Sequence, residues 1–192
     1  MPKVELPDLK KFEDALRLGI AKTFRRAVKD HAAEFVYGFC IYTDDDAGSL
    51  CCIVSTREAL TDQQSYYWTN GWPYDHAGHQ TLRAAQRLLS KAWDQYMNGP
   101  AKLYDSDDDR YWKLATRFKE SVFKTMLDAM HAAKRDGVFG TIAERRRRFI
   151  IFDISDSQRA ADNRVAWSRK LNVASVADAY ERREIPPSAE IG

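Results

Sequence analysis

Asp75, His76 and His79 are the residues of this chain whose types and spacing best suit chemistry. A carboxylate and two imidazoles so close together have the oxygen and nitrogen donors that zinc and other transition metals bind. They offer one interpretation, a small metal-dependent hydrolase of the nuclease-like kind. A closed metal site usually shows its ligands in two spaced groups, however, and His31 and His131 are isolated. Aspartate and histidine also cap helices, so we expect no metal and no other cofactor.

Two acidic segments, at 44–46 and 105–109, have the composition of calcium-binding loops but lack their spacing. A calcium loop of the EF-hand type needs alternating oxygen ligands, a glycine at its sixth position and a terminal glutamate. In the second segment Arg110 stands at that sixth position, and no glutamate is suitably placed. The first segment lies between two predicted strands. Both segments are therefore predicted to be solvated turns.

Four consecutive arginines, Arg145 to Arg148, are the densest charge in the chain and suit contact with phosphate groups. They directly precede a predicted strand, where side chains alternate between two faces, so only some of them would share a surface. The whole chain has a formal charge of +2 and a pI near 8.4. A dedicated nucleic-acid binder usually has a larger basic excess. A nucleic-acid contact domain using Arg145 to Arg148 stays an alternative, but nucleic acid is not the partner we expect.

Three cysteines, Cys40, Cys51 and Cys52, lie in a predicted hairpin and are too few for a disulfide framework. If Thr43 pairs with Ser49, Cys40 lies opposite Cys52. Apolar strand neighbours favour reduced, mostly buried thiols over a redox site, because a reactive thiol needs exposure and a depressed pKa. The sequence also has no nucleophile elbow, phosphate-binding loop or dinucleotide fingerprint. It therefore gives no support for nucleophilic catalysis.

Five large aromatic residues lie between positions 66 and 74, where the sequence also has a turn at 70–71. We predict a short third strand at 66–69. Tyrosine and tryptophan often anchor protein interfaces, because they combine a large apolar area with a polar group. In one interpretation Trp68 and Trp72 fill the end of the core, as tryptophans usually do. In the other, a surface patch meets a partner, and its candidate binding residues are Tyr67, Trp72, Tyr74 and His76.

The spacing of apolar residues predicts the elements that must position these side chains. Helices are predicted at 7–30, 79–97, 110–135, 157–170 and 173–183. We expect a break in the long third helix near 119–121, and Asn172 as the N-cap of the last helix. Strands are predicted at 34–43 and 50–56, joined as an antiparallel hairpin. A third run, at 147–155, is almost continuously apolar, which suits a central strand buried on both faces.

Finer patterns give three further expectations. Ser55 and Glu58 have the spacing of a capping box, which predicts a short helix opening at Thr56. The first strand alternates, so its apolar residues Phe35, Tyr37, Phe39 and Ile41 are predicted to share one face. The helix at 110–135 has an apolar stripe formed by Trp112, Ala115, Phe118, Val122, Met126, Met130 and Ala133.

The composition is that of an ordinary globular protein, with 192 residues, 44% of them hydrophobic and 30% charged. We expect an α+β fold: an antiparallel or mixed sheet of three to five strands, with helices packed mainly on one side. Residues 1–184 are predicted to form a single domain, and 185–192 a mobile tail. The N-terminal segment is charged and no stretch reaches the roughly 18 apolar residues of a membrane span. A cytoplasmic protein without a membrane partner is therefore expected.

Several segments together resemble a known family: FVYGFCIYT, LCCIVST, STREAL, WTNGWPYD, DGVFG, FIIFDISD and WSRKLN. From its first helix to about Tyr180, the chain is similar to the bacterial domain of unknown function family 4303. The resemblance implies an α+β domain and a link to bacterial toxin–immunity neighbourhoods, where many small intracellular domains neutralise a toxin. It implies no reaction and transfers no functional residues. We therefore expect a non-enzymatic protein-binding module of the toxin-immunity kind, with a toxin-like partner and an open oligomeric state.

Overall fold

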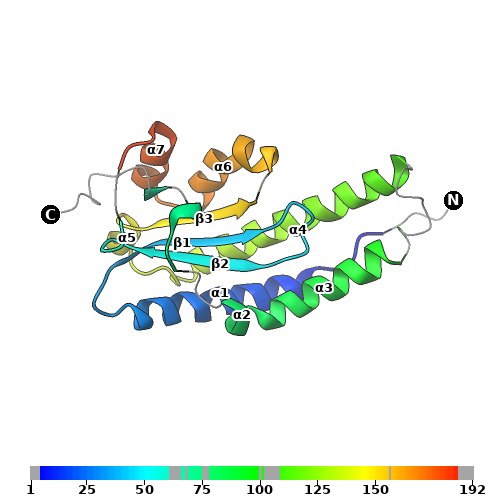
Figure 1. Ribbon diagram of the computed structural model, residues 1–192, viewed down its shortest axis with the longest axis horizontal. Coiled ribbons are helices and arrows are strands. Elements are labelled where there is room, and N and C mark those ends of the chain that lie inside the picture. The colour runs from blue at the N-terminus through cyan, green and yellow to red at the C-terminus, as the bar shows by residue number, and fades with distance from the viewer. Residues whose placement is uncertain are drawn as a thin grey trace.

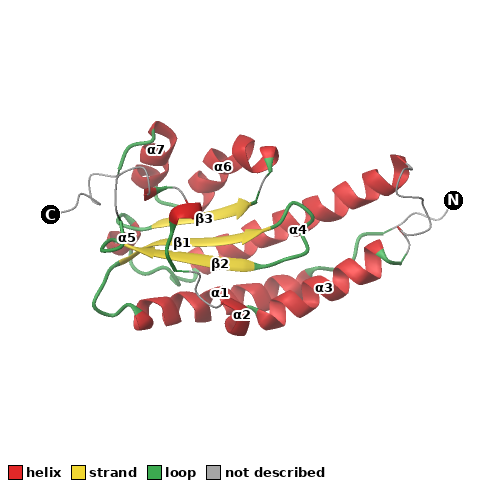
Figure 2. Ribbon diagram, viewed as in Figure 1, coloured by secondary structure: helices red, strands yellow, loops and turns green. Residues whose placement is uncertain are grey.

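The computed structural model describes residues 5–60, 66–67, 69–74, 78–99, 101, 109–155 and 157–185. These residues fold into a small sheet flanked by helices (Figures 1 and 2). The strands are β1 (Val36–Thr43), β2 (Cys51–Thr56) and β3 (Phe149–Ile154). The helices are α1 (Lys10–Asp30), α2 (Gly78–Thr81), α3 (Arg83–Met97), α4 (Asp109–Arg135), α5 (Ile142–Arg145), α6 (Gln158–Leu171) and α7 (Ala174–Arg182), with a 3-10 turn, η2 (Thr69–Gly71).

The sheet is mixed, with the strand order β2-β1-β3 among the described residues. β1 and β2 form the predicted antiparallel hairpin, whereas β3 pairs with β1 in parallel. A parallel neighbour needs a long connection, and the chain from α2 to α5 supplies it. Every residue of β3 is buried, as its apolar run predicts. The expectation that β3 is central is wrong, however, because β1 holds the middle position.

The hairpin register differs from the predicted one by a single residue. Cys40 lies opposite Ile53 rather than Cys52. Thr43 is not a ladder partner of Ser49; its Oγ1 instead donates a hydrogen bond of 2.6 Å to the Ser49 carbonyl oxygen. A slip of one residue moves each side chain to the other face of a sheet. Cys40 and Cys52 therefore lie in separate clusters of the core.

A bulge in β1 overturns the expectation that its apolar residues share one face. The ladder shifts register between Val36 and Gly38. An extra residue in one strand reverses the alternation of side chains beyond it. Phe39 and Ile41 therefore belong to the main hydrophobic core, whereas Tyr37 lies in the smaller cluster on the opposite face.

Helices lie on both faces of the sheet, with the larger layer on one side. α1, α3 and α4 bury their apolar stripes in the main core, against Phe39, Ile41 and Phe152. α7, Tyr66 and Trp72 cover the opposite face, in a cluster with Tyr37 and Phe149. α6 and α7 are seen together above β3 in Figure 1. The α+β fold class, with a mixed sheet, is confirmed.

The helices differ from their predictions in three places. α4 is one continuous helix of 27 residues, without the expected break near 119–121. Its stripe is buried from Ala115 to Ala133, but Trp112 is 55% exposed. The first turns of α4 extend beyond the sheet (Figure 1), so no strand layer covers that ring. The helix predicted at 79–97 is two helices, α2 and α3, which meet at the buried Leu82.

The helix expected to open at Thr56 does not form, because Ser55 and Thr56 both belong to β2. Glu58 does not cap a helix. Its Oε2 accepts a hydrogen bond of 3.0 Å from the backbone N–H of Phe35 and so ties the end of β2 to the start of β1. The Glu58 carboxylate thus bonds to a segment distant in sequence instead of forming the local capping box.

Asn172 is the C-cap of α6, not the N-cap of α7, whose N-cap is Val173. Its side-chain Oδ1 accepts a hydrogen bond from the Ile150 N–H, and its Nδ2 donates one to the Ile150 carbonyl oxygen, both at 2.8 Å. The same Nδ2 contacts the carbonyl oxygen of Ser168 at 3.0 Å. One amide thus satisfies both backbone groups of a β3 residue, which protects the strand from pairing with another chain.

We expect Asn172→Ala to lower the free energy of unfolding by about 2–3 kcal/mol, because the buried N–H of Ile150 loses its acceptor. The measurement is urea unfolding followed by circular dichroism. Asn98→Ala is the matched control, since Asn98 is also a helix C-cap but is exposed, and within the described chain its side chain bonds only to Asp94. A loss at Asn172 no larger than the loss at Asn98 would contradict the proposed protection of β3.

No helix among the described residues is long and apolar enough to cross a membrane. Residues 186–192 lie outside the described part of the chain, so the expected C-terminal tail stays a prediction. The assignment of 1–184 to a single domain also stays a prediction.

Candidate functional site

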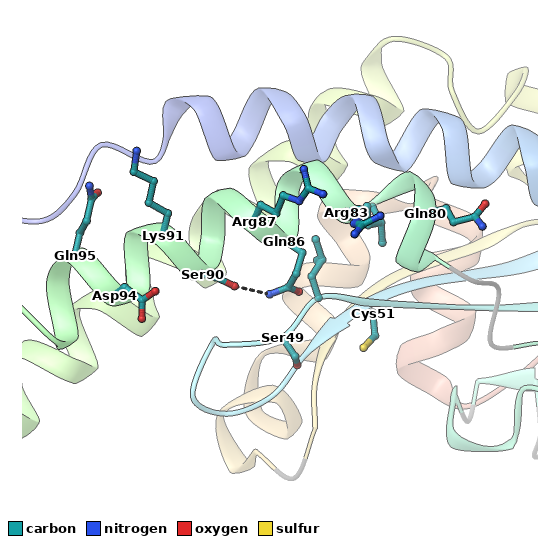
Figure 3. Close-up of a pocket in the computed structure, with 12 residues that line it drawn as sticks. Ser49, Cys51, Gln80, Arg83, Gln86, Arg87, Ser90, Lys91, Asp94 and Gln95 are labelled. Atoms are coloured by element: carbon teal, nitrogen blue, oxygen red, sulfur yellow. Dashed lines mark hydrogen bonds between the residues drawn. The ribbon is translucent and has the colours of Figure 1, made fainter.

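A groove of about 970 Å³ lies between α3 and the start of β2. We call it the α3 groove (Figure 3). Leu50 and Leu82, both buried, contribute to its apolar part, and Cys51 is half-buried at its side. The described residues that line it are Ser49, Leu50, Cys51, Gln80, Leu82, Arg83, Gln86, Arg87, Ser90, Lys91, Asp94 and Gln95.

The helical wall of the groove is positioned by close packing of α3 on α1. A Cβ atom added at Gly19 of α1 would lie 2.9 Å from the Leu82 side chain. Only glycine permits this approach. Nearby, the hydroxyl groups of Thr23 and Thr81 are 2.5 Å apart. The groove wall is therefore part of the packed core and not a loosely attached helix.

The opposite wall is the hairpin loop, whose shape is set by Asp44. Its Oδ1 accepts a hydrogen bond of 2.9 Å from the Gly48 N–H. Burial acts to raise the pKa of Asp44, but hydrogen bonds from Ser49 and Gly48 outweigh it and hold that pKa below its usual value. Gln86 then joins the two walls, since its Nε2 donates to the Gly48 carbonyl oxygen at 2.9 Å. This hydrogen bond ties the two walls of the groove together.

Three basic residues of α3, Arg83, Arg87 and Lys91, stand four residues apart and form what we call the cation row. In Figure 3, Arg87 and Lys91 lie on the flank of α3 away from the hairpin, and Gln86 and Ser90 lie on the flank toward it. All three cations are exposed. Among the described residues, none of them forms an ion pair or a hydrogen bond through its side chain.

The groove has no arrangement for catalysis among its described lining residues. Its one thiol, Cys51, is not placed beside a histidine there, and Asp94 accepts a hydrogen bond from Asn98. In the described part of the chain, no group of three or more histidine, cysteine, aspartate or glutamate residues is placed to hold a metal ion. Apolar surface beside a charged rim is an arrangement for binding a partner.

The predicted aromatic patch is largely occupied within the protein. Trp72 is 6% exposed. Tyr67 is half-buried; its ring packs on Phe149 and Tyr180, and its hydroxyl donates a hydrogen bond of 2.8 Å to the Glu184 carbonyl oxygen. Burial also raises the pKa of Tyr67 above its usual value. These contacts favour a structural role for Tyr67 and Trp72, two of the four residues of the predicted patch.

The rest of the aromatic segment gives a mixed result. Tyr74 is half-buried, packs against His31 with tilted rings whose centres are 4.2 Å apart, and forms an isolated antiparallel bridge with Val54. The strand predicted at 66–69 is wrong for its described residues, because Thr69 begins the turn η2. Trp68, His76 and Asp75 lie outside the described residues, as does the side chain of His79. The metal hypothesis therefore stays untested.

The arginine run does not form one surface. Arg148 is buried, and its guanidinium donates hydrogen bonds to the carbonyl oxygens of Val36 and Phe139. Arg147 is exposed and lies over the Phe35 ring, 4.4 Å from its centre. At least one of the four arginines is thus committed to the fold, which weakens the case for a phosphate-binding surface.

The thiols should differ in reactivity. Cys40 and Cys52 are buried and Cys51 is half-buried, with no disulfide among the three. Burial raises the pKa of Cys40 well above its usual value, and only the thiolate reacts. We expect a maleimide to label Cys51 first and the other two only as fast as the protein opens. Mass spectrometry of timed samples measures this, and Cys51→Ser should remove the fast phase. Equal rates at all three positions would contradict the structure.

The chain belongs to a known family without an assigned activity. Residues 19–173 match the model of the domain of unknown function DUF4303, so the resemblance predicted from sequence is confirmed. No curated protein and no solved structure matches this chain. The family therefore defines the class of protein and assigns it no activity.

Proposed function

We propose that this chain is a non-enzymatic protein-binding module and that the α3 groove is its binding site. The observation that carries the proposal is the groove, with its apolar part at Leu50 and Leu82 and its exposed polar rim. Protein interfaces combine an apolar centre with a polar rim in this way. The groove serves better than the predicted aromatic patch, because Tyr67 and Trp72 already pack within the protein.

The finer proposal is that the partner is a bacterial toxin, which this chain neutralises in the cytoplasm. It is supported by the family resemblance and its link to toxin–immunity neighbourhoods. Neutralising a toxin requires occupation of its surface and no chemistry, which suits a groove without a catalytic arrangement among its described residues. The hydrolase alternative depends on Asp75, His76 and His79, and no described contact favours it.

The test uses the protein encoded beside this chain in its genome. Produced alone in a bacterial host it should arrest growth, and co-production of this chain should restore growth. Ser90→Trp should abolish the rescue, because Ser90 is exposed and lines the groove, where an indole would obstruct a partner. Growth and a pull-down of the purified pair give the two readouts.

Ser175→Trp is the matched control. Ser175 is also an exposed helical serine, but it lies on α7, at the opposite face of the sheet. This variant should rescue growth as the unchanged chain does. If Ser90→Trp folds, binds and rescues normally, the groove is not the site. If the neighbouring protein is harmless but binds the groove, the toxin proposal is wrong and the proposal of a binding module stands.

A further inference from the structure

We infer that the segment bound in the α3 groove is acidic, with carboxylates that meet the cation row of Arg83, Arg87 and Lys91. This inference rests on the proposed function and names the chemistry of the partner. Three features of the groove support it: the charge of the row, its spacing and the kind of surface beside it.

Among the described residues, no carboxylate is paired with the row; Asp94, three residues after Lys91, bonds to Asn98 instead. Like charges four residues apart on a helix repel each other and destabilise it slightly. Other exposed cations on helices of the described chain do have acidic partners: Lys124 has Asp128, and Arg169 has Asp178 and Glu181. The row has no such partner among the described residues. An anionic partner would relieve this repulsion on binding.

The spacing of the row suits a peptide. Four residues of α-helix rise about 6 Å, so the three cations stand at intervals of about that length. Alternate residues of an extended chain are about 6.6 Å apart. An extended segment laid along α3 can therefore direct every second side chain to the row. The side chains between them then face the apolar part of the groove at Leu50 and Leu82.

The surface beside the row favours a protein segment over a nucleic acid. Single-stranded nucleic acid binds where aromatic rings stack with its bases, and the described lining of the groove has no aromatic residue. Its wall instead offers the amide of Gln95 and the hydroxyl of Ser90, which suit a peptide backbone, whereas the Gln86 amide nitrogen already donates to Gly48 and Ser90. The geometry thus points to a peptide in which acidic and apolar residues alternate.

The probe is a fluorescent peptide of alternating glutamate and leucine, titrated with the full chain and followed by fluorescence anisotropy. We expect binding that weakens as salt is raised, because exposed charges are screened. The triple variant Arg83→Glu, Arg87→Glu, Lys91→Glu should bind the peptide at least tenfold more weakly. The corresponding glutamine variant should lie between the two. A lysine–leucine peptide should not bind the unchanged chain.

The control reverses three other exposed cations, Lys22, Arg25 and Lys29 of α1, which do not line the groove. It changes the net charge equally and should keep peptide binding. Melting temperatures check that all variants are folded.

Three results would overturn the inference: no binding of the acidic peptide at about 1 mM, equal loss in the control, or tighter binding of a thymidine oligonucleotide. If the neighbouring protein binds the triple variant normally but does not bind Ser90→Trp, the inference of an acidic segment is wrong and the proposal of a binding module stands.

Discussion

Replacing Arg148 by alanine is expected to lower the free energy of unfolding by about 3–5 kcal/mol, as the removal of one partner from a buried charged network does. Arg148 is 6% exposed. Its Nη1 donates to the Phe139 carbonyl oxygen at 2.7 Å and its Nε to the Val36 carbonyl oxygen at 3.2 Å. Its Nη2 lies 3.2 Å from Glu144 Oε1. The variant would leave two carbonyl oxygens without this donor.

The same side chain also joins elements far apart in sequence. Its guanidinium lies over the rings of Phe24 and Phe35, 5.2 and 5.1 Å from their centres. Burial lowers the pKa of Arg148, and the neighbouring Glu144 counteracts that effect. Planar donors of fixed geometry serve two carbonyl oxygens and a carboxylate at once, which a lysine ammonium cannot reproduce. Arg148→Lys should therefore recover only part of the lost stability.

Urea unfolding of Arg148→Ala, Arg148→Lys and the control Arg146→Ala tests this expectation. Arg146 belongs to the same run but is exposed, and surface substitutions usually change stability by less than about 0.5 kcal/mol. The urea midpoint should be highest for the control Arg146→Ala, lower for Arg148→Lys and lowest for Arg148→Ala. Equal losses for Arg146→Ala and Arg148→Ala would show that the run acts as a uniform charged surface, and would restore the case for nucleic-acid contact.

Sequence patterns predicted the elements well where apolar spacing alone decides them. α4, α6 and β3 lie within two residues of their expected positions because their stripes or runs are long. The errors occur where a distant segment competes for a local group. Glu58 satisfies a backbone N–H of β1 instead of capping a helix, and Asn172 bonds to β3 instead of beginning α7. Neither partner can be inferred from neighbours in the sequence.

The candidate site was missed for a related reason. The helix that carries Arg83, Arg87 and Lys91 was predicted, and its basic residues are visibly four apart. The spacing of its apolar residues predicts how the helix packs but not what its basic face borders. The groove also needs the loop at 48–51 beside α3, and that contact depends on the Gln86 hydrogen bond to Gly48. A helical row of three cations four residues apart is the signal that sequence reasoning could have used.

Trp72→Ala is the second large expected effect, a loss of about 3–5 kcal/mol in the free energy of unfolding, as for other buried tryptophans. The ring is buried in the smaller cluster, at 5.8 Å from the Tyr37 ring. It also covers Gly38, where an added Cβ would lie 2.7 Å from Trp72 Cη2. A glycine in a strand commonly marks such a close approach, and here the approach explains why β1 carries one.

Gly38 and Trp72 allow a double-mutant cycle. It separates the contact between these two residues from a general loss of stability in the segment. Gly38→Ala alone should destabilise the protein, because its methyl group collides with the indole. In the Trp72→Ala background the same change should be nearly neutral, since the collision is gone, so the two effects are strongly non-additive. Tyr74→Ala, at a half-buried ring, should cost clearly less than Trp72→Ala. Additive effects of the two changes would mean that the indole does not rest on Gly38. If Trp72→Ala leaves the stability unchanged but abolishes partner binding, the interface lies in the aromatic segment and not in the α3 groove.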